Sequence, residues 1–262
     1  MADISERPLA VIIMAAGQGK RMQDPTRAKV LYPLAGKPML GHVLTLCEAL
    51  HSKKTVCIIG FGREQVSEYA SREFPMVLTA IQEEQLGTGH AVQQAERQLE
   101  GFEGDVLVLS GDVPLLTLET VQRLIETHRA GKALATVLAV TLPDPSGYGR
   151  IVRTESGHLA KIVEEKDATP EERAIVEINT GIYVFDCETL FAVLKRIDRR
   201  NAQGEYYLTD TFALIIEQFG SASVAIESTD DAPEVAGVNT KVQLEALEGE
   251  YVRRTTQMAT IS

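Results

Sequence analysis

A glycine-rich segment followed by basic residues is the first place where the sequence indicates chemistry. Gly17 and Gly19 follow directly on an apolar run, and Arg21 and Lys29 come after them. Glycines permit positive φ and close approach, so the backbone N–H groups of such a turn can hold a phosphate. The two basic side chains would add the positive charge that a phosphate needs. Taken alone, a tight turn with no ligand is an equally good interpretation.

Two familiar phosphate-binding patterns do not fit this segment. The dinucleotide fingerprint needs glycine or alanine at the position of Met22 and a helix directly afterwards. The pattern G-x-x-x-x-G-K-[ST] is absent. The spacing G-x-G-x-R-M followed by a lysine therefore predicts a phosphate site of another type.

An aspartate just after a buried strand is the second candidate. Asp112 follows the apolar run 105–109, and its carboxylate is the hard oxygen ligand that Mg²⁺ prefers. A turn or helix-capping aspartate is the alternative interpretation. We favour a metal ligand, because a metal supplies the charge that a phosphate at the glycine-rich segment requires.

A third candidate lies in the loop that leads into a helix after residue 87. The amide of Gln82 can donate and accept at once, as the imide edge of uracil requires. Gly87 allows an unusual backbone turn, and Thr88 is the expected N-cap of the helix. A simple loop before a helix explains the same residues equally well.

Polar residues at predicted strand ends in the second half would suit sugar hydroxyls. Each of them alone is more simply a turn or surface residue. The group includes Gly149, Glu164, Asn179, Tyr207, Thr209 and Asn239.

Several classes of function are disfavoured. The five histidines show no H-x₃-H zinc pattern, and Ser110 lacks the G-x-S-x-G context of a hydrolase nucleophile. The net charge of −11 disfavours nucleic acid and anionic membranes as partners. There is no apolar run of 18 residues, and the polar residues 1–7 do not resemble a signal peptide. Three cysteines without metal or disulfide spacing predict free thiols in a reducing cytoplasm.

The elements that must position these residues follow from the apolar pattern. Continuous apolar runs predict strands buried on both faces, as in a parallel sheet. Helical spacing between the runs predicts crossover helices and a doubly wound α/β sheet, which binds ligands at its carboxyl edge. The predicted strands are 9–15, 55–59, 76–81, 105–109 and 133–140, and the predicted helices are 38–50, 66–70, 91–99 and 118–125.

The second half of the chain is richer in short strands. We expect a hairpin over 148–163, a strand over 177–185, a helix over 208–219, a strand over 224–226 and a last helix from Thr240, whose capping box includes Gln243. We predict a single domain over 1–262. It comprises a nucleotide-binding part (8–145), a sugar-phosphate-binding part (146–240) and a C-terminal helix (240–262).

The motifs occur in a recognisable order from about Leu9 to about Leu247. They are MAAGQGKRM, the lysine of AKVL, QEEQLGTGHA, SGDVPLL, DPSGYGRI, IVEEKDAT, EINTGIYVF, NAQGEYYLTD and VAGVN. The chain thereby resembles the N-acetylglucosamine-1-phosphate uridylyltransferases of the sugar-nucleotidyltransferase superfamily. The part of this family that the chain resembles is the pyrophosphorylase half of a bifunctional bacterial enzyme.

The resemblance implies a Rossmann-like nucleotidyltransferase with a small β-rich sugar-binding subregion. It implies Mg²⁺-assisted, in-line attack of N-acetylglucosamine 1-phosphate on UTP, giving UDP-N-acetylglucosamine, a peptidoglycan precursor, and pyrophosphate in the cytoplasm. Its catalytic residues would be Arg21 and Lys29. Ala15, Ala16, Gly17, Gln82, Gly87 and Thr88 would bind the nucleotide, Gly149, Glu164, Asn179, Tyr207 and Thr209 the sugar, and Asp112 and Asn239 the metal.

Two departures accompany the resemblance. The family often has tyrosine where this chain has Ser110. The bifunctional enzymes also continue into a β-helix of hexapeptide repeats, which does not occur here. A naturally single-function protein and an excised domain both explain this, and the oligomeric state does not carry over.

Three other functions remain as alternatives. A nucleotidylyltransferase for another nucleotide and sugar phosphate would share all these motifs. A glycosyltransferase would usually need D-x-D, but Ser110 stands two residues before Asp112. A non-catalytic nucleotide-sugar sensor would not need Arg21, Lys29, Asp112 and Asn239 together.

Overall fold

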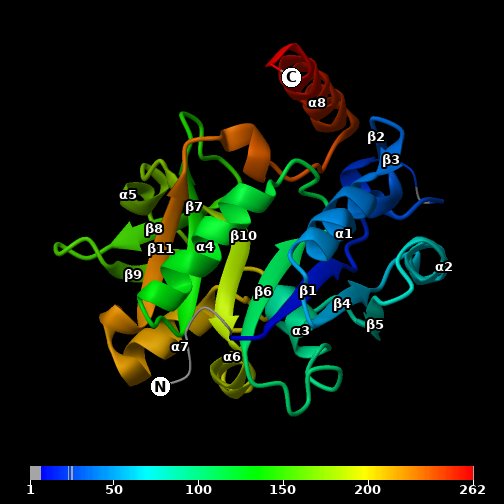
Figure 1. The fold of residues 1–262 in the computed structure, drawn as a ribbon. Helices are drawn as coiled ribbons and strands as arrows, with labels where there is room; N and C mark the ends of the chain where they lie inside the picture. The colour runs from blue at the N-terminus through cyan, green and yellow to red at the C-terminus, as the bar shows by residue number, and fades with distance from the viewer. Residues whose placement is uncertain (1–6, 23, 25, 262) are drawn as a thin grey trace.

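A single twisted sheet with helices on both faces forms the protein (Figure 1). This computed structural model describes residues 7–22, 24 and 26–261. Residues 1–6, on which the prediction about a signal peptide mainly rests, and residue 262 of the predicted domain lie outside them. Within the described residues, no helix is both long and apolar enough to cross a membrane.

The sheet contains nine strands among the described residues. Its main order is β11-β7-β10-β6-β1-β4-β5, and the hairpin β8–β9 is attached to β10. The strands are β1 Leu9–Ala15, β4 Lys54–Ile59, β5 Leu78–Ile81, β6 Asp105–Ser110, β7 Ala135–Thr141, β8 Gly149–Arg153, β9 Leu159–Val163, β10 Glu177–Asp186 and β11 Val224–Thr229; β2 Pro33–Leu34 and β3 Lys37–Pro38 form a separate ribbon.

The helices connect and cover these strands. They are α1 Met39–Ala49, α2 Arg63–Glu73, α3 Thr88–Gln93, α4 Leu118–Ala130, α5 Pro170–Arg173, α6 Cys187–Leu194, α7 Asp210–Phe219 and α8 Lys241–Ile261. In Figure 1, α8 extends away from the sheet beside the β2–β3 ribbon.

The predicted doubly wound, mostly parallel sheet is confirmed. β1 runs parallel to both β4 and β6, β4 is parallel to β5, and β11 is parallel to β7. β10 runs antiparallel between β6 and β7, which the sequence pattern did not predict. Because of this reversal, the beginning of β10 lies at the edge where β6 and β7 end.

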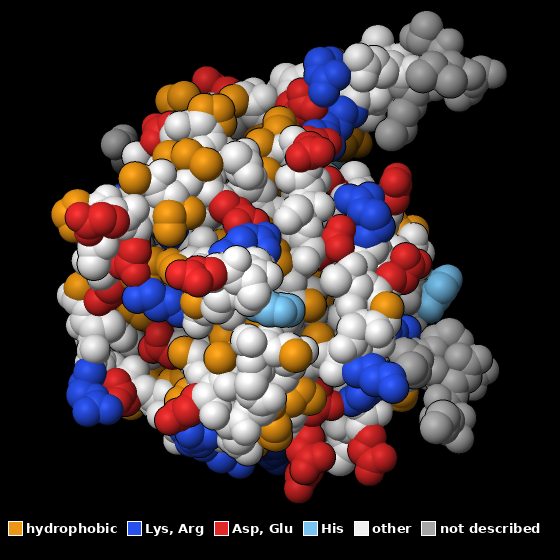
Figure 2. Space-filling view, turned by 90° about the vertical axis from the view of Figure 1, so that its left-hand side faces the viewer, with side chains coloured by type: hydrophobic (Ala, Val, Ile, Leu, Met, Phe, Trp, Pro, Cys, Tyr) orange, Lys and Arg blue, Asp and Glu red, His pale blue; other side chains and the backbone are white. Residues whose placement is uncertain are grey.

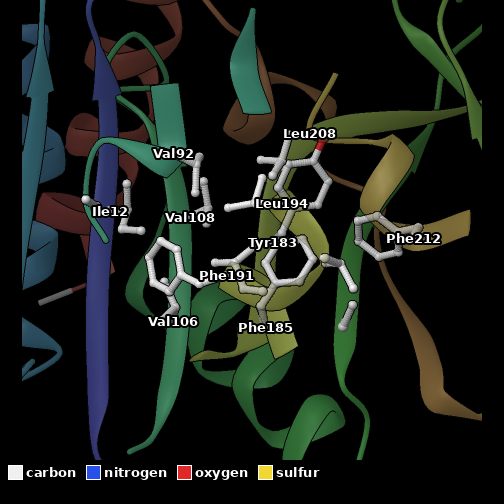
Figure 3. Packing of buried hydrophobic residues seen from close by; sticks show 14 of the residues in the cluster. Ile12, Val92, Val106, Val108, Tyr183, Phe185, Phe191, Leu194, Leu208 and Phe212 are labelled. Atoms are coloured by element: carbon white, nitrogen blue, oxygen red, sulfur yellow. The ribbon is translucent and has the colours of Figure 1, made fainter. Parts of the chain in front are cut away.

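Alternate residues of each central strand enter two separate cores. In β1, Ala10 and Ile12 pack with α3, α6 and α7, whereas Val11 and Ile13 pack with α1, α2 and α4. Figure 3 shows the first core, where Tyr183, Phe185 and Phe212 lie together. Burial on both faces explains why the strand sequences are continuously apolar.

The element boundaries differ from prediction in several places. Pro38 is the N-cap of α1 and not its first residue. Gly87, and not Thr88, is the N-cap of α3, because the Thr88 hydroxyl instead accepts a hydrogen bond from the Leu208 backbone N–H at 3.0 Å. β5 begins at Leu78, since Met76 is 88% exposed and lies outside the ladder.

Two helical segments also differ. α3 ends at Gln93, and the chain continues to Leu99 as a series of turns. α6 was not predicted, although it is buried along one side. The predicted hairpin β8–β9 and the capping box of α8 are confirmed, since the Thr240 hydroxyl and the Gln243 amide exchange hydrogen bonds with each other's backbone N–H groups.

We expect Phe212→Ala to lower the free energy of unfolding by about 3–5 kcal/mol. Phe212 is fully buried, and its ring centroid lies 5.3 Å from that of Phe185 and 5.5 Å from that of Tyr183. Urea unfolding followed by circular dichroism measures the change. Phe219→Ala is the control in the same helix, because Phe219 is 49% exposed. Equal losses in the two variants would show that this core is not packed as described.

Candidate active site

A cleft of about 740 Å³ lies at the carboxyl edge of the sheet. Parallel strands bring the segments that follow them to this edge. The cleft is lined by all ten residues predicted to bind nucleotide or metal or to act in catalysis: Ala15, Ala16, Gly17, Arg21, Lys29, Gln82, Gly87, Thr88, Asp112 and Asn239. Distant motifs therefore form one site.

The segment 15–22, here called the phosphate loop, is tied to neighbouring strand ends. The Ala16 carbonyl oxygen accepts hydrogen bonds from the Phe61 backbone N–H at 3.1 Å and the Gln85 amide at 2.8 Å. Gly19 uses the positive φ that a glycine permits, at +59°, whereas Gly17 does not. Gly17 is exposed in the cleft, and a Cβ there would meet nothing within 4 Å. Its backbone is thus open to a ligand.

Lys29, Asp112 and Asn239 meet at one point. The Lys29 ammonium donates hydrogen bonds to the Asp112 carboxylate and, at 3.2 Å, to Asn239 Oδ1. Ser110 Oγ donates to the second oxygen of Asp112 at 2.6 Å. Ser110 therefore orients the carboxylate, which gives the serine at this position a role in this chain.

Arg21 carries a charge that the described part of the chain does not neutralise. Its side chain is exposed in the cleft and makes no hydrogen bond or ion pair with the described residues. On the face shown in Figure 2, acidic and basic side chains are interspersed. In a protein of net charge −11, Arg21 is therefore a local centre of positive charge available to an anionic ligand.

Gln82 and Gly87 form another part of the cleft. The buried Gln82 amide donates to the Gly87 carbonyl oxygen and to His90 Nδ1, each at 3.1 Å. Gly87 has φ +115°, and a Cβ there would lie 2.5 Å from the Tyr206 carbonyl oxygen. Only glycine fits such a position. The side chain of Gln82 is thus fixed before any ligand binds.

The predicted sugar-binding residues do not line this cleft, but four of them lie in linked pairs beside it. Thr209 Oγ1 donates to Glu164 Oε1 at 2.9 Å, and Asn179 pairs with Gly149 between β10 and β8. A Cβ on Gly149 would lie 3.4 Å from Glu164 Oε2, so the two pairs are neighbours. The fifth, Tyr207, donates to Asp167 at 3.1 Å.

Among the other residues that line the cleft, two come from the sugar-phosphate-binding part predicted for 146–240, and no role was predicted for them. Gln203 and Glu205 line the cleft from the loop before α7. The motif NAQGEYYLTD contains both, so the signal was present, but the residue types alone indicated no role. They extend the cleft towards Tyr207 and Thr209.

Comparison with known proteins agrees with this geometry. The family described as nucleotidyl transferase matches residues 10–230. The chain belongs to the nucleotidyl transferase family. It is 47% identical over 233 residues to "Bifunctional protein GlmU" of Geobacillus thermodenitrificans, covering 89% of this chain and 50% of that protein. It is 46% identical over 255 residues to the protein of that name from Corynebacterium jeikeium, covering 96% and 51%. The chain thus spans about half the length of these relatives.

The family membership indicates a divalent metal, and the residues present fit one. Asp112 and Asn239 supply two hard oxygens, and the Lys29 ammonium that lies between them shows that the position favours a cation. Among the described residues, there is no cluster of three or more His, Cys, Asp or Glu suited to a metal. A nucleotidyl transferase metal at this point would therefore take its remaining ligands from water or from phosphate oxygens.

Several carboxylates lie around the residues that were predicted to bind the sugar. Burial raises the pKa of Glu164, with further contributions from Asp167 and Glu205. Burial also raises the pKa of Asp210, the first residue of α7, to about 6, and Glu164, Asp198 and Asp167 add to the effect. This end of the nucleotidyl transferase is thus electrostatically unfavourable for a second anion unless cations accompany it.

We expect Asp210→Asn to raise the free energy of unfolding, relative to the unmodified protein, by more at pH 7.5 than at pH 4.5. The folded pKa of about 6 exceeds the ordinary value of 3.8. The contribution of Asp210 to stability is therefore present below about pH 4 and is lost as the pH rises through about 6. The full shift corresponds to about 3 kcal/mol, which we reduce to about 1 kcal/mol because the carboxylate is half-exposed and screened.

Urea unfolding of both proteins at the two pH values tests this. Glu245→Gln, at an exposed position of α8, is the control and should change little with pH. A pH-independent difference between Asp210→Asn and the unmodified protein would contradict the assignment.

Proposed function

We propose that this nucleotidyl transferase joins UTP to N-acetylglucosamine 1-phosphate and releases pyrophosphate. The observation that carries the proposal is the convergence of Lys29, Asp112 and Asn239 beside the phosphate loop. A phosphate loop, basic side chains and a cation position together suit phosphoryl transfer between two anions. The motifs shared with the uridylyltransferases support the choice of substrates.

The fixed amide of Gln82 supports uracil as the base. Because both amide N–H groups of Gln82 already donate to Gly87 and His90, its Oε1 is left to accept the imide N–H of uracil, and backbone N–H groups of the loop before α3 could donate to the uracil oxygens. Because Gln82 is already held by Gly87 and His90, it loses little side-chain entropy when it binds. Discrimination between bases would therefore arise at this loop.

The reaction needs no side-chain base, because the attacking oxygen belongs to a phosphate that is already ionised. Arg21 and the backbone of the phosphate loop would bind and orient the triphosphate, and Arg21 would stabilise charge on the departing pyrophosphate. The aliphatic stem of Lys29 lies beside Gly19 while its ammonium reaches Asp112 and Asn239, so Lys29 would carry positive charge between the phosphate loop and the metal position. Mg²⁺, held by Asp112 and Asn239, would supply Lewis-acid stabilisation of phosphate charge when bound.

The amino sugar would be held by the residues beside the cleft. Glu164 and Asn179 offer hydrogen-bonding groups suited to hydroxyls and to an acetamido N–H, and Gly149 lies beside them, since a Cβ there would come 3.4 Å from Glu164 Oε2. Residues 8–145 would then be the nucleotide-binding part, and residues 146–240 the sugar-phosphate-binding part. A cytoplasmic location fits these substrates and the three buried free cysteines.

Pyrophosphate release from the purified protein with Mg²⁺ tests the substrate pair. UTP, dTTP, CTP and GTP are each combined with N-acetylglucosamine 1-phosphate and with glucose 1-phosphate. We expect release with UTP and the acetylated sugar in preference to all other pairs. Release with a different pair would keep the chemistry and replace the substrates. No release from folded protein that still binds UDP-N-acetylglucosamine would indicate a sensor.

Substitutions in the cleft should separate catalysis from binding. We expect Asp112→Ala and Arg21→Ala each to lower kcat about 100-fold or more, because each removes charge stabilisation of the transition state. We expect Gln82→Ala to raise KM for UTP about 10-fold with a smaller change in kcat. Steady-state kinetics with saturating Mg²⁺ measures both constants.

Arg27→Ala is the control for the arginine, because Arg27 is exposed and stacks on Tyr32 outside the cleft. Near-normal turnover of Asp112→Ala with Mg²⁺ would remove the metal from the proposal.

A further inference from the structure

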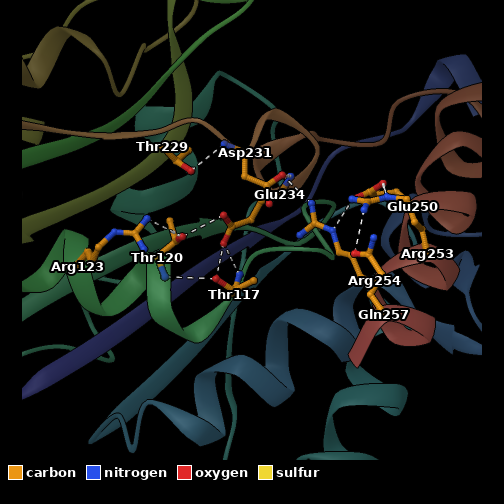
Figure 4. A network of polar contacts seen from close by, with 10 residues as sticks. All are labelled: Thr117, Thr120, Arg123, Thr229, Asp231, Glu234, Glu250, Arg253, Arg254 and Gln257. Carbon is orange, nitrogen blue, oxygen red and sulfur yellow. Dashed lines mark hydrogen bonds and ion pairs between the residues drawn. The ribbon is translucent and has the colours of Figure 1, made fainter. Parts of the chain in front are cut away.

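A buried carboxylate without a cationic partner lies behind the metal position. Glu234, in the short 3₁₀ helix η5 (Ala232–Val235), is 3% exposed. Its Oε1 accepts hydrogen bonds from the Thr117 backbone N–H at 2.8 Å and hydroxyl at 2.5 Å, and its Oε2 accepts from the Thr120 hydroxyl at 3.0 Å (Figure 4). No Lys, Arg or His among the described residues forms an ion pair with it.

This arrangement does not by itself favour stability. Burying a carboxylate costs several kcal/mol, and neutral hydroxyl and amide donors offset only part of that cost. An apolar contact could join α4 to η5 at a lower cost in free energy. The three hydrogen bonds that the Glu234 carboxylate accepts are directional. They can fix the position of η5 relative to the start of α4, which gives a physical reason for a buried carboxylate there.

The two segments that Glu234 joins are those that carry the metal ligands. Thr117 follows Asp112 by five residues, and Glu234 precedes Asn239 by five residues. The segments meet again at the cleft, where the Val238 backbone N–H donates to the Asp112 carbonyl oxygen at 3.0 Å. The two segments are therefore joined at two points. Glu234 joins them at one point, and the hydrogen bond between Val238 and Asp112 joins them at the other, next to the two proposed metal ligands.

Helix α8 and its start hold the same segment from the other side. The Gln243 amide oxygen accepts from the Asn239 backbone N–H at 2.8 Å. Arg254 donates to Asp231 Oδ1 at 2.6 Å, and this oxygen also accepts from the Glu234 backbone N–H at 3.3 Å (Figure 4). Residues 231–239 are thus fixed in several places. Glu234 supplies the side-chain hydrogen bonds from these residues to the segment that follows Asp112.

We propose that Glu234 is a positioning residue that sets the separation of Asp112 from Asn239 and so determines the affinity for the divalent metal. This inference rests on the metal site of the proposed function. Partners that orient metal ligands commonly change metal affinity about 10–100-fold when they are removed. Glu234 touches neither substrate nor metal in this role.

Glu227 provides a matched control in the same part of the fold. It lies on β11, and its Oε2 accepts from the Thr127 hydroxyl at 2.6 Å. It therefore ties the chain before η5 to α4 through Thr127, towards the other end of that helix, and it also forms an ion pair with Arg123 at 3.8 Å. Loss of Glu227 should affect stability without moving Asn239.

The experiment measures Mn²⁺ binding to the nucleotide-free protein by electron paramagnetic resonance, together with the Mg²⁺ concentration that half-activates pyrophosphate release. We expect Glu234→Ala to raise both values about 10-fold or more, and Glu227→Ala to change them less than about 2-fold. We expect Glu234→Gln to stay within about 3-fold, because its amide oxygen can accept from Thr117 and its NH₂ can donate to the Thr120 hydroxyl. Thermal unfolding of each variant measures stability separately.

An unchanged Mn²⁺ dissociation constant in folded Glu234→Ala overturns the proposal, even if the protein is less stable. If that variant does not fold, Thr120→Val removes one hydrogen bond to Glu234 and should still raise the Mn²⁺ dissociation constant about 3-fold. No rise there also overturns it. If the unmodified protein binds Mn²⁺ but releases no pyrophosphate, only the proposed function is contradicted. If the unmodified protein binds no Mn²⁺, the role of Glu234 is overturned.

Discussion

The contact of the Lys29 ammonium with Asp112 and Asn239 is the interaction on which the arrangement of the cleft depends. Asp112 follows Lys29 by 83 positions in the chain, and Asn239 follows it by 210. They meet only because β1 lies between β4 and β6 and because the segment after η5 returns to the end of β6. The sheet order thereby brings the basic side chains of Arg21 and Lys29 to the same edge as the Asp112 carboxylate.

Much of the fold follows from local sequence signals. Strands such as β1 and β6 are predictable because residues on both faces are buried, which leaves a continuous apolar run. The reversed β10 is not predictable in this way, because its apolar residues pack equally well in either direction. The helix α6 was missed because it follows β10 without a loop, although Asp186, which caps it by accepting a hydrogen bond from the Thr189 backbone N–H, is a sequence signal for a helix start.

The cleft was predictable where a motif stands at the end of a strand. The prediction for Thr88 as a cap was wrong because a contact with Leu208, far along the chain, takes its hydroxyl. Of the two properties that a glycine permits, Gly17 has the open space for close approach and not the positive φ. Glu234 gave no signal at all, because its partners Thr117 and Thr120 lie more than 100 residues away.

The attachment of the β8–β9 hairpin has a mechanical consequence. The hairpin joins β10 through two described residue pairs, Ile178 with Arg150 and Asn179 with Gly149. Just beyond them the ladder between β10 and β7 is interrupted at Gly181, whose φ is +80°. Ile151, Leu159 and Ile162 of the hairpin are nevertheless buried in the core that contains Phe212, so side-chain packing holds the hairpin where few ladder bonds do. Glu164, which directly follows β9, is therefore fixed beside Thr209, and displacing it would require that core to repack.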